Sequence, residues 1–254
     1  MPWNPEVYNQ FKDVRYLPFF DLIRFISPDG LKKAIDIGCG TGEQTQILSG
    51  KFSDADFLGI DPSAEMLAQS ETFKNERLRF KQKTVEELYN STDTWDLIFS
   101  NAALQWSDDH EKLFPKLLSL LSENGQFAVQ MPFQAGNILN QILFQLASEE
   151  PYKTHLQNWN RISPVLSLDE YSRMMFEYGL KYLQISIKVY PIVAENAEKL
   201  FQFISGSALI PYLEKLEENT KQQFIEEYKK RIAEKFQKFP AIYAFKRILL
   251  YGRK

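Results

Sequence analysis

The chain of 254 residues contains little cysteine, little histidine and no large excess of charge. Its single cysteine, Cys39, excludes an intramolecular disulfide scaffold and fits a reducing compartment such as the cytosol. Its 30 Lys and Arg residues against 33 Asp and Glu residues argue against a protein that coats nucleic acid or an anionic membrane. We therefore predict a cytoplasmic protein without a nucleic-acid partner.

Long apolar runs are also missing. No segment approaches the roughly 18 consecutive apolar residues that cross a bilayer. The first residues, Met1 to Glu6, do not combine a basic stretch with an apolar one as signal peptides do. We therefore expect neither a membrane partner nor a secretory signal. A chain of this length is sufficient for one large core that carries a sizeable insertion.

Between residues 34 and 131, short apolar segments alternate with helix-like segments, which is typical of βαβ units in a parallel sheet. The expected strands are Lys33–Ile37, Asp56–Ile60, Leu78–Lys81, Trp95–Ser100 and Gln126–Met131. The helices expected between them are Gly42–Lys51, Ala64–Phe73, Val85–Tyr89 and His110–Leu121. Pro62-Ser63 should begin the second of these helices, and Asn124-Gly125 should end the last.

Further elements are expected on both sides of this alternation. Pro5–Lys12 and Pro18–Ile26 predict two helices, with Pro18 in the favoured first turn of the second. Residues 133–178 and 195–238 repeat apolar residues at helical intervals, and Tyr182–Val193 and Ile242–Tyr251 predict two more strands. The fold class is therefore α/β: a doubly wound, mostly parallel sheet of seven strands with helical insertions. Such sheets bind ligands at the carboxyl ends of their strands.

A glycine-rich turn follows the first expected strand, in the sequence Asp36-Ile37-Gly38-Cys39-Gly40-Thr41-Gly42. Glycines at such a turn let the backbone approach a ligand closely. The dinucleotide fingerprint G-x-G-x-x-G requires a glycine where this chain has Glu43, which disfavours a nicotinamide or flavin cofactor. Asp36 adds negative charge where a pyrophosphate needs hydrogen-bond donors, and it therefore favours a positively charged cofactor.

A second acidic residue, Asp61, ends the second expected strand about twenty residues after the glycine turn. From this position a carboxylate can accept hydrogen bonds from both hydroxyls of a ribose. The alternative interpretation is that Asp61 only caps the helix that follows.

These features resemble the class I S-adenosylmethionine-dependent methyltransferases, which combine a D-x-G-x-G-x-G turn with an acid after the second strand. More narrowly, four segments resemble the trans-aconitate methyltransferases over essentially the whole chain: Trp3-Asn4-Pro5-x-x-Tyr8-x-x-Phe11, Asn101-Ala102-Ala103-Leu104-Gln105-Trp106-x-x-Asp109-His110, Val129-Gln130-Met131-Pro132 and Pro211-Tyr212-Leu213. The resemblance implies a Rossmann-like, monomeric enzyme. It implies S-adenosyl-L-methionine as cofactor, S-adenosyl-L-homocysteine as product, a small carboxylate as substrate and no metal.

The resemblance also assigns cofactor-binding residues, position by position. Asp36, Gly38 and Gly40 should lie against the amino-acid part of the cofactor, and Asp61 should bind the ribose hydroxyls. Met66 should cover the adenine, although an ordinary core methionine is the alternative.

Further cofactor contacts are implied after the third and fourth strands and near the N-terminus. The family's usual Ala-Asp pair at the adenine amino group is replaced in this chain, so Val85 or Glu86 should serve. Asn101 and Ala102 should reach the methionyl part through their carbonyls. Arg15 should pair with the cofactor carboxylate, and an exposed surface arginine is the alternative.

On the substrate side, the resemblance implies contacts from Trp3, Tyr8, Gln105, Trp106 and Tyr212. Tyr8, Gln105 and Trp106 would position the reactants, unless Trp106 instead fills the core beside the sheet. No side-chain acid or base is needed for a carboxylate acceptor, because it is already ionised at pH 7. The scarcity of histidine is then expected, and His110 is predicted to be a solvated residue at a helix start.

One position departs from the family. Where trans-aconitate enzymes have an arginine before Pro211-Tyr212-Leu213, this chain has Ile210. A polycarboxylate would then need a cation from Arg161, Arg173, Arg247 or a lysine, and a less charged acid as substrate is the alternative.

Two other functions compete with methylation of a small acid. A malonyl carrier-protein O-methyltransferase shares the Asn-x-x-x-Gln-Trp sequence, and the Lys and Arg excess after Lys229 would supply a docking surface unless it is only solvated helix surface. A non-catalytic cofactor-binding relative is the other alternative. Methylation of nucleic-acid bases is disfavoured because Asn101 is followed by Ala102-Ala103-Leu104 rather than by two prolines and an aromatic residue.

The family pattern divides one compact unit into three parts. Residues 1–30 should form an N-terminal helical lid. Residues 31–132, 179–194 and 241–254 should form the cofactor-binding α/β core. Residues 133–178 and 195–240 should form helical cap insertions on the substrate side.

Overall fold

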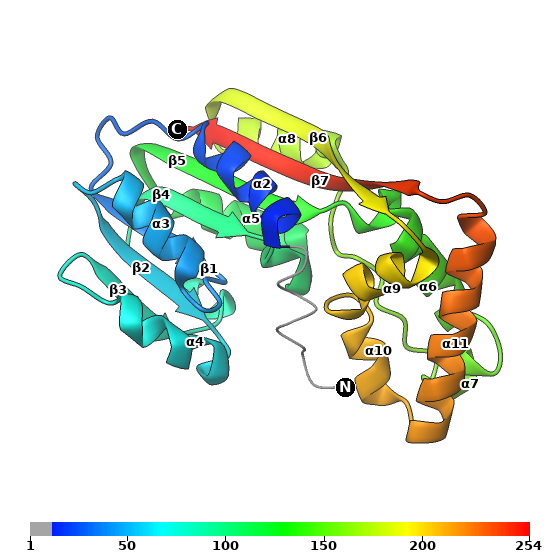
Figure 1. Cartoon of the computed structure of the whole chain (residues 1–254). Helices are drawn as coiled ribbons and strands as arrows, with labels where there is room; N and C mark the ends of the chain where they lie inside the picture. Colours follow the sequence, from blue (N-terminus) through cyan, green and yellow to red (C-terminus); the bar gives the residue numbers. More distant parts are fainter. Residues whose placement is uncertain (1–11) are drawn as a thin grey trace. The chain divides into compact units, whose positions relative to one another are not determined.

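A computed structural model of the chain describes residues 12–254. The expected helix Pro5–Lys12, apart from its last residue, and the predicted substrate residues Trp3 and Tyr8 lie outside the described residues. Contacts divide the described chain into two compact units, whose elements are drawn in Figure 1. The sheet unit consists of Pro18–Pro132, Pro164–Lys188 and Arg247–Lys254, and the helical unit of residues 12–17, Phe133–Ser163 and Val189–Lys246.

The sheet has seven strands in the order β3-β2-β1-β4-β5-β7-β6. Their bounds are β1 (Lys33–Ile37), β2 (Asp56–Asp61), β3 (Leu78–Gln82), β4 (Trp95–Asn101), β5 (Leu121–Pro132), β6 (Lys181–Ala194) and β7 (Ala241–Arg253). Strands β1 to β5 pair in parallel, and β7 pairs antiparallel with β5. The predicted α/β class with a doubly wound, mostly parallel sheet is therefore confirmed.

Helices connect the parallel strands, as the alternating pattern predicts. The sheet unit contains α3 (Glu43–Lys51), α4 (Ala64–Ser70), α5 (His110–Ser119), α8 (Leu168–Glu177) and the short 3-10 helices η1 (Glu71–Phe73), η2 (Glu86–Leu88) and η3 (Leu104–Trp106). Ser63 caps α4, because its hydroxyl accepts a hydrogen bond of 3.2 Å from the Met66 N–H. The predicted start of this helix at Pro62-Ser63 is confirmed.

The two faces of the sheet bury different sets of apolar side chains. Side chains of Ala34, Phe57, Leu97 and Phe99 join one core cluster with residues of α3 and of the helix before β1. On β5, Ala128 joins this cluster, whereas the next residue toward the N-terminus, Phe127, contacts Phe114 of α5 at a ring distance of 5.6 Å. Because successive side chains of a strand point to opposite faces, apolar residues are buried on both faces of the sheet, as a doubly wound sheet requires.

The helix before β1 starts earlier than predicted. It runs over Lys12–Ile23 as α2, so Pro18 lies inside it rather than in its first turn. The prediction relied on the preference of proline for the first helical turn. Within a helix, Pro18 has no N–H to donate to the Val14 carbonyl, so one backbone hydrogen bond is missing. The nearby side chains of Phe19, Leu22 and Ile23 are all buried.

The Asn124-Gly125 pair does not end α5, contrary to the prediction. The helix already ends at Ser119, and β5 begins at Leu121. Asn124 has φ 64°, and the pairing of β5 with β4 is interrupted between Leu121 and Gln126. The pair therefore produces a left-handed irregularity within a longer strand.

The helical unit packs around aromatic side chains. Its helices are η4 (Gln134–Gly136), α6 (Ile138–Ala147), α7 (Tyr152–His155), α9 (Ala197–Ser205), α10 (Ile210–Lys215) and α11 (Glu218–Lys235). The ring of Phe224 on α11 lies 5.0 Å from that of Tyr152 and 6.0 Å from that of Tyr212. Tyr228 is fully buried and donates a hydrogen bond of 2.8 Å to the Leu139 carbonyl. These contacts join α6, α7, α10 and α11.

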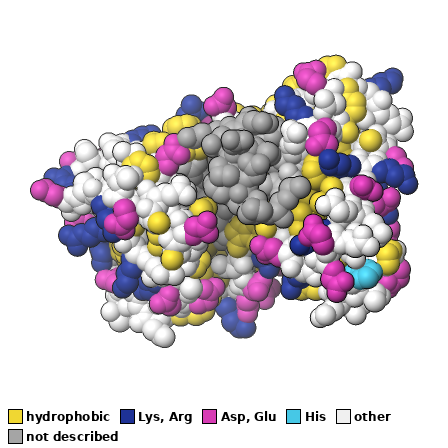
Figure 2. All heavy atoms as spheres, turned by 60° about the horizontal axis from the view of Figure 1, so that its bottom comes forward, with side chains coloured by type: hydrophobic (Ala, Val, Ile, Leu, Met, Phe, Trp, Pro, Cys, Tyr) yellow, Lys and Arg dark blue, Asp and Glu magenta, His cyan; other side chains and the backbone are white. Residues whose placement is uncertain are grey.

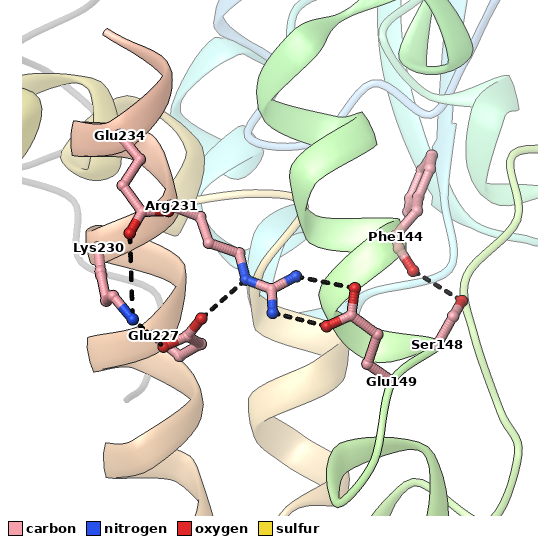
Figure 3. A network of polar contacts seen from close by, with 7 residues as sticks. All are labelled: Phe144, Ser148, Glu149, Glu227, Lys230, Arg231 and Glu234. Atoms are coloured by element: carbon pink, nitrogen blue, oxygen red, sulfur yellow. Dashed lines mark hydrogen bonds and ion pairs between the residues drawn. The ribbon is translucent and has the colours of Figure 1, made fainter. Parts of the chain in front are cut away.

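Three of the basic residues that start at Lys229 are paired with acids: Lys229, Lys230 and Arg231. On the face drawn in Figure 2, basic and acidic side chains of the described residues are interspersed. Figure 3 shows the Arg231 guanidinium, which binds both oxygens of Glu149 and also bonds Glu227 at 2.9 Å. Lys229 contacts Glu198 at 2.8 Å. These ion pairs join residues within the helical unit.

The expected division into lid, core and cap stays a prediction. Contacts group Pro164–Lys188 with the sheet unit, whereas the sequence pattern included residues 133–178 in a cap. Among the described helices, none combines the length and the apolar character needed to span a bilayer.

Candidate cofactor site

The carboxyl ends of β1, β2 and β4 bring the predicted cofactor residues to one edge of the sheet. The neighbours of β1 are β2 on one side and β4 on the other, so the strand order reverses at this point. In doubly wound sheets the ligand crevice lies outside the carboxyl ends of the strands at such a reversal. Asp36, Asp61 and Asn101 all lie at this edge, on three neighbouring strands.

Two glycines of the turn after β1 have different structural reasons to lack a side chain. Gly38 has φ +76°, and a Cβ added there would lie 2.1 Å from the Cβ of Ala103. Gly40 has φ +55°, but the nearest atom to an added Cβ is Cε of Met66, at 3.7 Å. Gly38 is therefore required by packing against the segment after β4. Gly40 leaves its backbone accessible to a ligand.

Asp61 holds the glycine turn in place. Its carboxylate accepts hydrogen bonds of 2.9 Å from the N–H groups of Gly40 and Ser63. Ser63, not Asp61, is the residue that caps α4, so the alternative of a mere helix cap is wrong. A carboxylate has about four acceptor sites. Asp61 therefore keeps acceptor capacity for ribose hydroxyls next to the accessible backbone of Gly40.

Asp36 is a buried acid beside the turn. Its side chain is 3% exposed, and the Thr45 hydroxyl donates a hydrogen bond of 2.6 Å to it. Burial raises the pKa of Asp36 to about 7; the Thr45 bond lowers it, and the nearby Asp61 charge raises it. A cation bound at this edge would favour the ionised form of Asp36. The sequence pattern did not identify Thr45, which lies in the first turn of α3.

The predicted adenine contacts lie around Asp61. Met66 is half-buried in the first turn of α4, near Gly40, so it is not an ordinary core methionine. The Lys83 N–H donates a hydrogen bond of 3.1 Å to the Asp61 carbonyl, which places the segment after β3 next to the end of β2. In this segment Val85 is buried and Glu86 is exposed.

Asn101 belongs to a chain of polar side chains that the sequence did not predict. Its amide donates a hydrogen bond of 2.8 Å to Gln44, and its oxygen accepts one of 2.5 Å from Gln130. The Arg247 Nε in turn donates to the Gln130 side-chain oxygen. This chain links the start of α3 to β7, and no local sequence signal indicates it because its members are far apart in sequence.

The segment after β4 carries the predicted substrate residues. Ala102 has φ 57°, and its carbonyl accepts a hydrogen bond of 2.6 Å from the amide of Gln105, which is buried. Trp106 is 44% exposed, so the alternative that it fills the core is wrong. A left-handed conformation at a residue other than glycine is strained and is frequent at functional sites.

Two further predicted residues lie in the helical unit. Arg15 donates a hydrogen bond of 2.9 Å to the Phe203 carbonyl and stacks on the Phe203 ring at 4.8 Å, so it is not a simple surface arginine. Tyr212 is fully buried; its hydroxyl donates to Asn160 at 2.6 Å and accepts from the Arg161 N–H at 3.1 Å. The cofactor role of Arg15 and the substrate role of Tyr212 stay predictions.

His110 differs from its prediction. It does begin α5, but it is 1% exposed instead of solvated. Its ring nitrogens lie within hydrogen-bond distance of the Tyr171 hydroxyl and the Leu104 carbonyl. No local sequence pattern indicates the contact with Tyr171, which lies 61 positions away.

The donor set at the sheet edge fits S-adenosylmethionine. A buried carboxylate at Asp36 suits a cationic ligand, and the carboxylate of Asp61 suits ribose hydroxyls next to the accessible backbone of Gly40. Within residues 12–254, no group of three or more His, Cys, Asp or Glu residues is arranged to hold a metal ion.

The sheet order, the glycine turn and the two strand-end acids define a class I S-adenosylmethionine-dependent methyltransferase. In agreement, the family model described as "Methyltransferase domain" matches residues 35–129. The chain is 37% identical to the trans-aconitate 2-methyltransferase of Deinococcus radiodurans, over 100% of this chain and 99% of that protein. It is 29% identical to that of Escherichia coli O1:K1, over 99% and 98%. The chain belongs to the trans-aconitate 2-methyltransferase family.

Solved structures share the fold of this chain. The YcgJ protein of Bacillus subtilis superposes with a TM-score of 0.60 at 19% identity, over 93% of this chain and 97% of that one. Phosphoethanolamine N-methyltransferase 2 of Haemonchus contortus, solved with S-adenosylhomocysteine, superposes with a TM-score of 0.55 at 17% identity, over 97% of this chain and 52% of that one. At these identities the likeness concerns the fold alone.

Proposed function

We propose that this methyltransferase transfers the methyl group of S-adenosylmethionine to a carboxylate of a small polycarboxylic acid such as trans-aconitate, and forms a methyl ester. The observation that carries the proposal is the 37% identity, over the full length of both chains, to a trans-aconitate 2-methyltransferase. The acids and glycines of the cofactor site are all present in this chain, which disfavours a non-catalytic relative.

Methyl transfer to a carboxylate needs no catalytic acid or base from the protein. When bound, S-adenosylmethionine supplies an activated methyl group on a sulfonium. A carboxylate acceptor is ionised at pH 7 and needs no general base. The protein then acts by orienting the acceptor and excluding water. Consistent with this, both ring nitrogens of the buried His110 already have partners in the protein.

The proposal gives the predicted residues their roles. The cofactor would be held by Arg15, Asp36, Gly38, Gly40, Asp61, Met66, Val85, Glu86, Asn101 and Ala102. The acceptor would contact Trp3, Tyr8, Gln105, Trp106 and Tyr212. The enzyme of this proposal is a cytoplasmic monomer.

Arg247 is the cation that we propose for a substrate carboxylate. Ile210 supplies no charge, and Arg173 is exposed on α8. Arg247 is 8% exposed, pairs in register with Pro132 at the carboxyl end of β5, and is oriented by Gln130. A guanidinium oriented in this way is suited to bind a carboxylate with two hydrogen bonds.

Methylation of a malonyl carrier protein is disfavoured. That substrate would need a basic docking surface. Three of the cations that would form it, Lys229, Lys230 and Arg231, are engaged with Glu198, Glu227 and Glu149.

The proposed function predicts a base-labile methyl ester. We expect transfer of labelled methyl from S-adenosylmethionine to trans-aconitate, with release of the label in alkali. The cis isomer, with the same charge and a different arrangement of carboxylates, should be a much poorer acceptor, and malonyl carrier protein should not be labelled. An alkali-stable product, or labelling of the carrier protein alone, would contradict the proposal.

Asp61→Ala should weaken cofactor binding by about 1.5–3 kcal/mol, or roughly 10- to 150-fold, because charge-assisted hydrogen bonds are lost. Titration calorimetry with S-adenosylhomocysteine measures this effect. Asp61→Asn keeps an acceptor for the turn and should lose less. Asp56→Ala, an exposed position at the other end of β2, is the control and should bind normally. Equal affinities in all variants would rule out the ribose contact.

A further inference from the structure

His110 is a buried titratable residue that methyl transfer to a carboxylate does not use. It is 1% exposed at the first position of α5. Its Nδ1 lies 2.5 Å from the Tyr171 hydroxyl of α8, and its Nε2 lies 2.9 Å from the Leu104 carbonyl of η3. The rings of His110 and Tyr171 also both pack on Phe114, with centroid distances of 5.0 Å and 4.7 Å. His110 therefore joins three elements of the sheet unit.

These partners define which atom donates each hydrogen bond. The Leu104 carbonyl can only accept, so Nε2 of His110 must carry a hydrogen. The Tyr171 oxygen already accepts a hydrogen bond of 3.1 Å from the Leu166 N–H. Its own hydrogen is then donated to Nδ1 of a neutral imidazole. The chain of donors runs from Leu166 through Tyr171 and His110 to Leu104, and each donor has an acceptor.

The segment that His110 holds has a strained backbone. Residues 102–109 contain η3, and left-handed residues lie at both ends: Ala102 with φ 57° and Asp109 with φ 54°. Within η3, the Ser107 N–H donates to the same Leu104 carbonyl at 3.0 Å. Strained backbone persists only where its surroundings fix it. The His110 bond supplies such a restraint from outside the segment.

We propose that His110 and Tyr171 are positioning residues that fix η3, and through it Gln105 and Trp106, for the acceptor. The inference rests on the proposed function, because Gln105 and Trp106 are assigned to the acceptor side there. The cofactor residues Asp36 and Asp61 lie on β1 and β2, outside this network, and Ala102, at the β4 end of the segment, is held separately by a bond of 2.8 Å from its N–H to the Gln130 carbonyl of β5. Loss of the network should therefore lower turnover and leave cofactor affinity unchanged.

Two substitutions separate the two hydrogen bonds of His110. His110→Asn keeps an acceptor at the Nδ1 position for Tyr171 but loses the donor to Leu104. His110→Gln keeps a donor at the Nε2 position. We expect His110→Asn to lower kcat about 100-fold, as a displacement of about 1 Å does. His110→Gln and Tyr171→Phe should lose about tenfold or less. The affinity for S-adenosylhomocysteine should stay within about twofold in all three, since Asp36 and Asp61 are untouched and the Ala102 N–H keeps its bond to the Gln130 carbonyl.

The control is His155→Asn, at the exposed second histidine on α7, which should match the wild type. Unchanged turnover in His110→Asn would overturn the proposal. A parallel loss of cofactor affinity and turnover would also overturn it, since that pattern indicates a general structural role. If His110→Asn does not fold, Tyr171→Phe decides by the same two measurements.

Hydrogen exchange tests the same role without any acceptor. The amides of Trp106 and Ser107 should exchange faster in His110→Asn than in the wild type, whereas those of Gly38 and Gly40 should not change. If the wild-type enzyme methylates no acid, the proposed function fails, and these exchange rates still decide whether His110 fixes η3. Unchanged rates at Trp106 and Ser107 would reject the positioning role.

Discussion

Gly38→Ala should destabilise the protein by about 2–5 kcal/mol and strongly reduce cofactor binding. The added Cβ would lie 2.1 Å from the Cβ of Ala103, so one of the two segments must move. Overpacking of this kind costs about 1–3 kcal/mol, and a left-handed conformation adds about 1–2 kcal/mol for a residue with a Cβ. The N–H groups of Gly38 and Cys39 both bond the Ile60 carbonyl, so movement of the turn also disturbs its attachment to β2.

Gly30→Ala is the matched control for this prediction. Gly30 has φ +74°, nearly the same as Gly38, but an added Cβ would meet no atom within 4 Å. Its substitution should cost only the backbone strain, about 1–2 kcal/mol, and should leave cofactor binding intact. Chemical denaturation and calorimetry with S-adenosylhomocysteine measure both effects.

A double substitution isolates the contact. Ala103→Gly removes the Cβ that the new side chain would meet, so it should recover part of the stability lost in Gly38→Ala. If Gly38→Ala is no worse than Gly30→Ala, or if Ala103→Gly recovers nothing, the Ala103 contact is not the reason for glycine at this position.

The parallel part of the fold could be predicted because its signal is local. Apolar runs between turn residues indicate buried strands, and β1, for example, runs over Lys33–Ile37 as predicted. The cap at Ser63 has an equally local signal. The predictions from Pro18 and Asn124-Gly125 were wrong because they used the preferences of single residues. The packing of the helix that contains Pro18 and of the strand that contains Asn124-Gly125 outweighs these preferences.

The candidate site was predictable only in part. Asp36, Gly40 and Asp61 lie at or just after the carboxyl ends of strands that the pattern identified, so their meeting at one sheet edge was foreseeable. The burial of His110 was not, because it depends on Tyr171, which reaches it from a distant helix. The polar chain from Gln44 to Arg247 is also formed by residues that only the tertiary fold brings together. Specific polar contacts of this kind produce no periodic pattern of residues in the sequence.

Cofactor affinity should increase with pH up to about 7, because Asp36 must ionise to pair with a cation. Burial raises the pKa of Asp36 to about 7 in the folded protein, from 3.8 for an exposed aspartate. Below pH 7 Asp36 is mainly protonated. It must therefore lose its proton before it can pair with the cationic cofactor. The affinity for S-adenosylmethionine should then fall by up to about tenfold for each pH unit below 7.

Without cofactor, the same group should make the protein less stable as the pH rises. Between pH 4 and 7 the folded state keeps a proton on Asp36 that the unfolded state has lost, so the free energy of unfolding falls as the pH increases. The contribution is fully present below about pH 4 and lost above pH 7. A difference of about three pKa units corresponds to an upper limit of about 4 kcal/mol.

Asp36→Asn separates this contribution from that of other carboxylates. Asparagine keeps an acceptor for the Thr45 hydroxyl but cannot ionise. Relative to the wild type, the variant should gain stability at pH 8 and gain little near pH 4, measured by denaturation without cofactor. Its cofactor affinity should be low and independent of pH between 5 and 8. Stability and affinity curves that run parallel to those of the wild type would show that Asp36 neither titrates in this range nor pairs with the cofactor. The opposite slopes expected for stability and affinity have one origin: burial disfavours the ionised form of Asp36, whereas a bound cationic cofactor favours it.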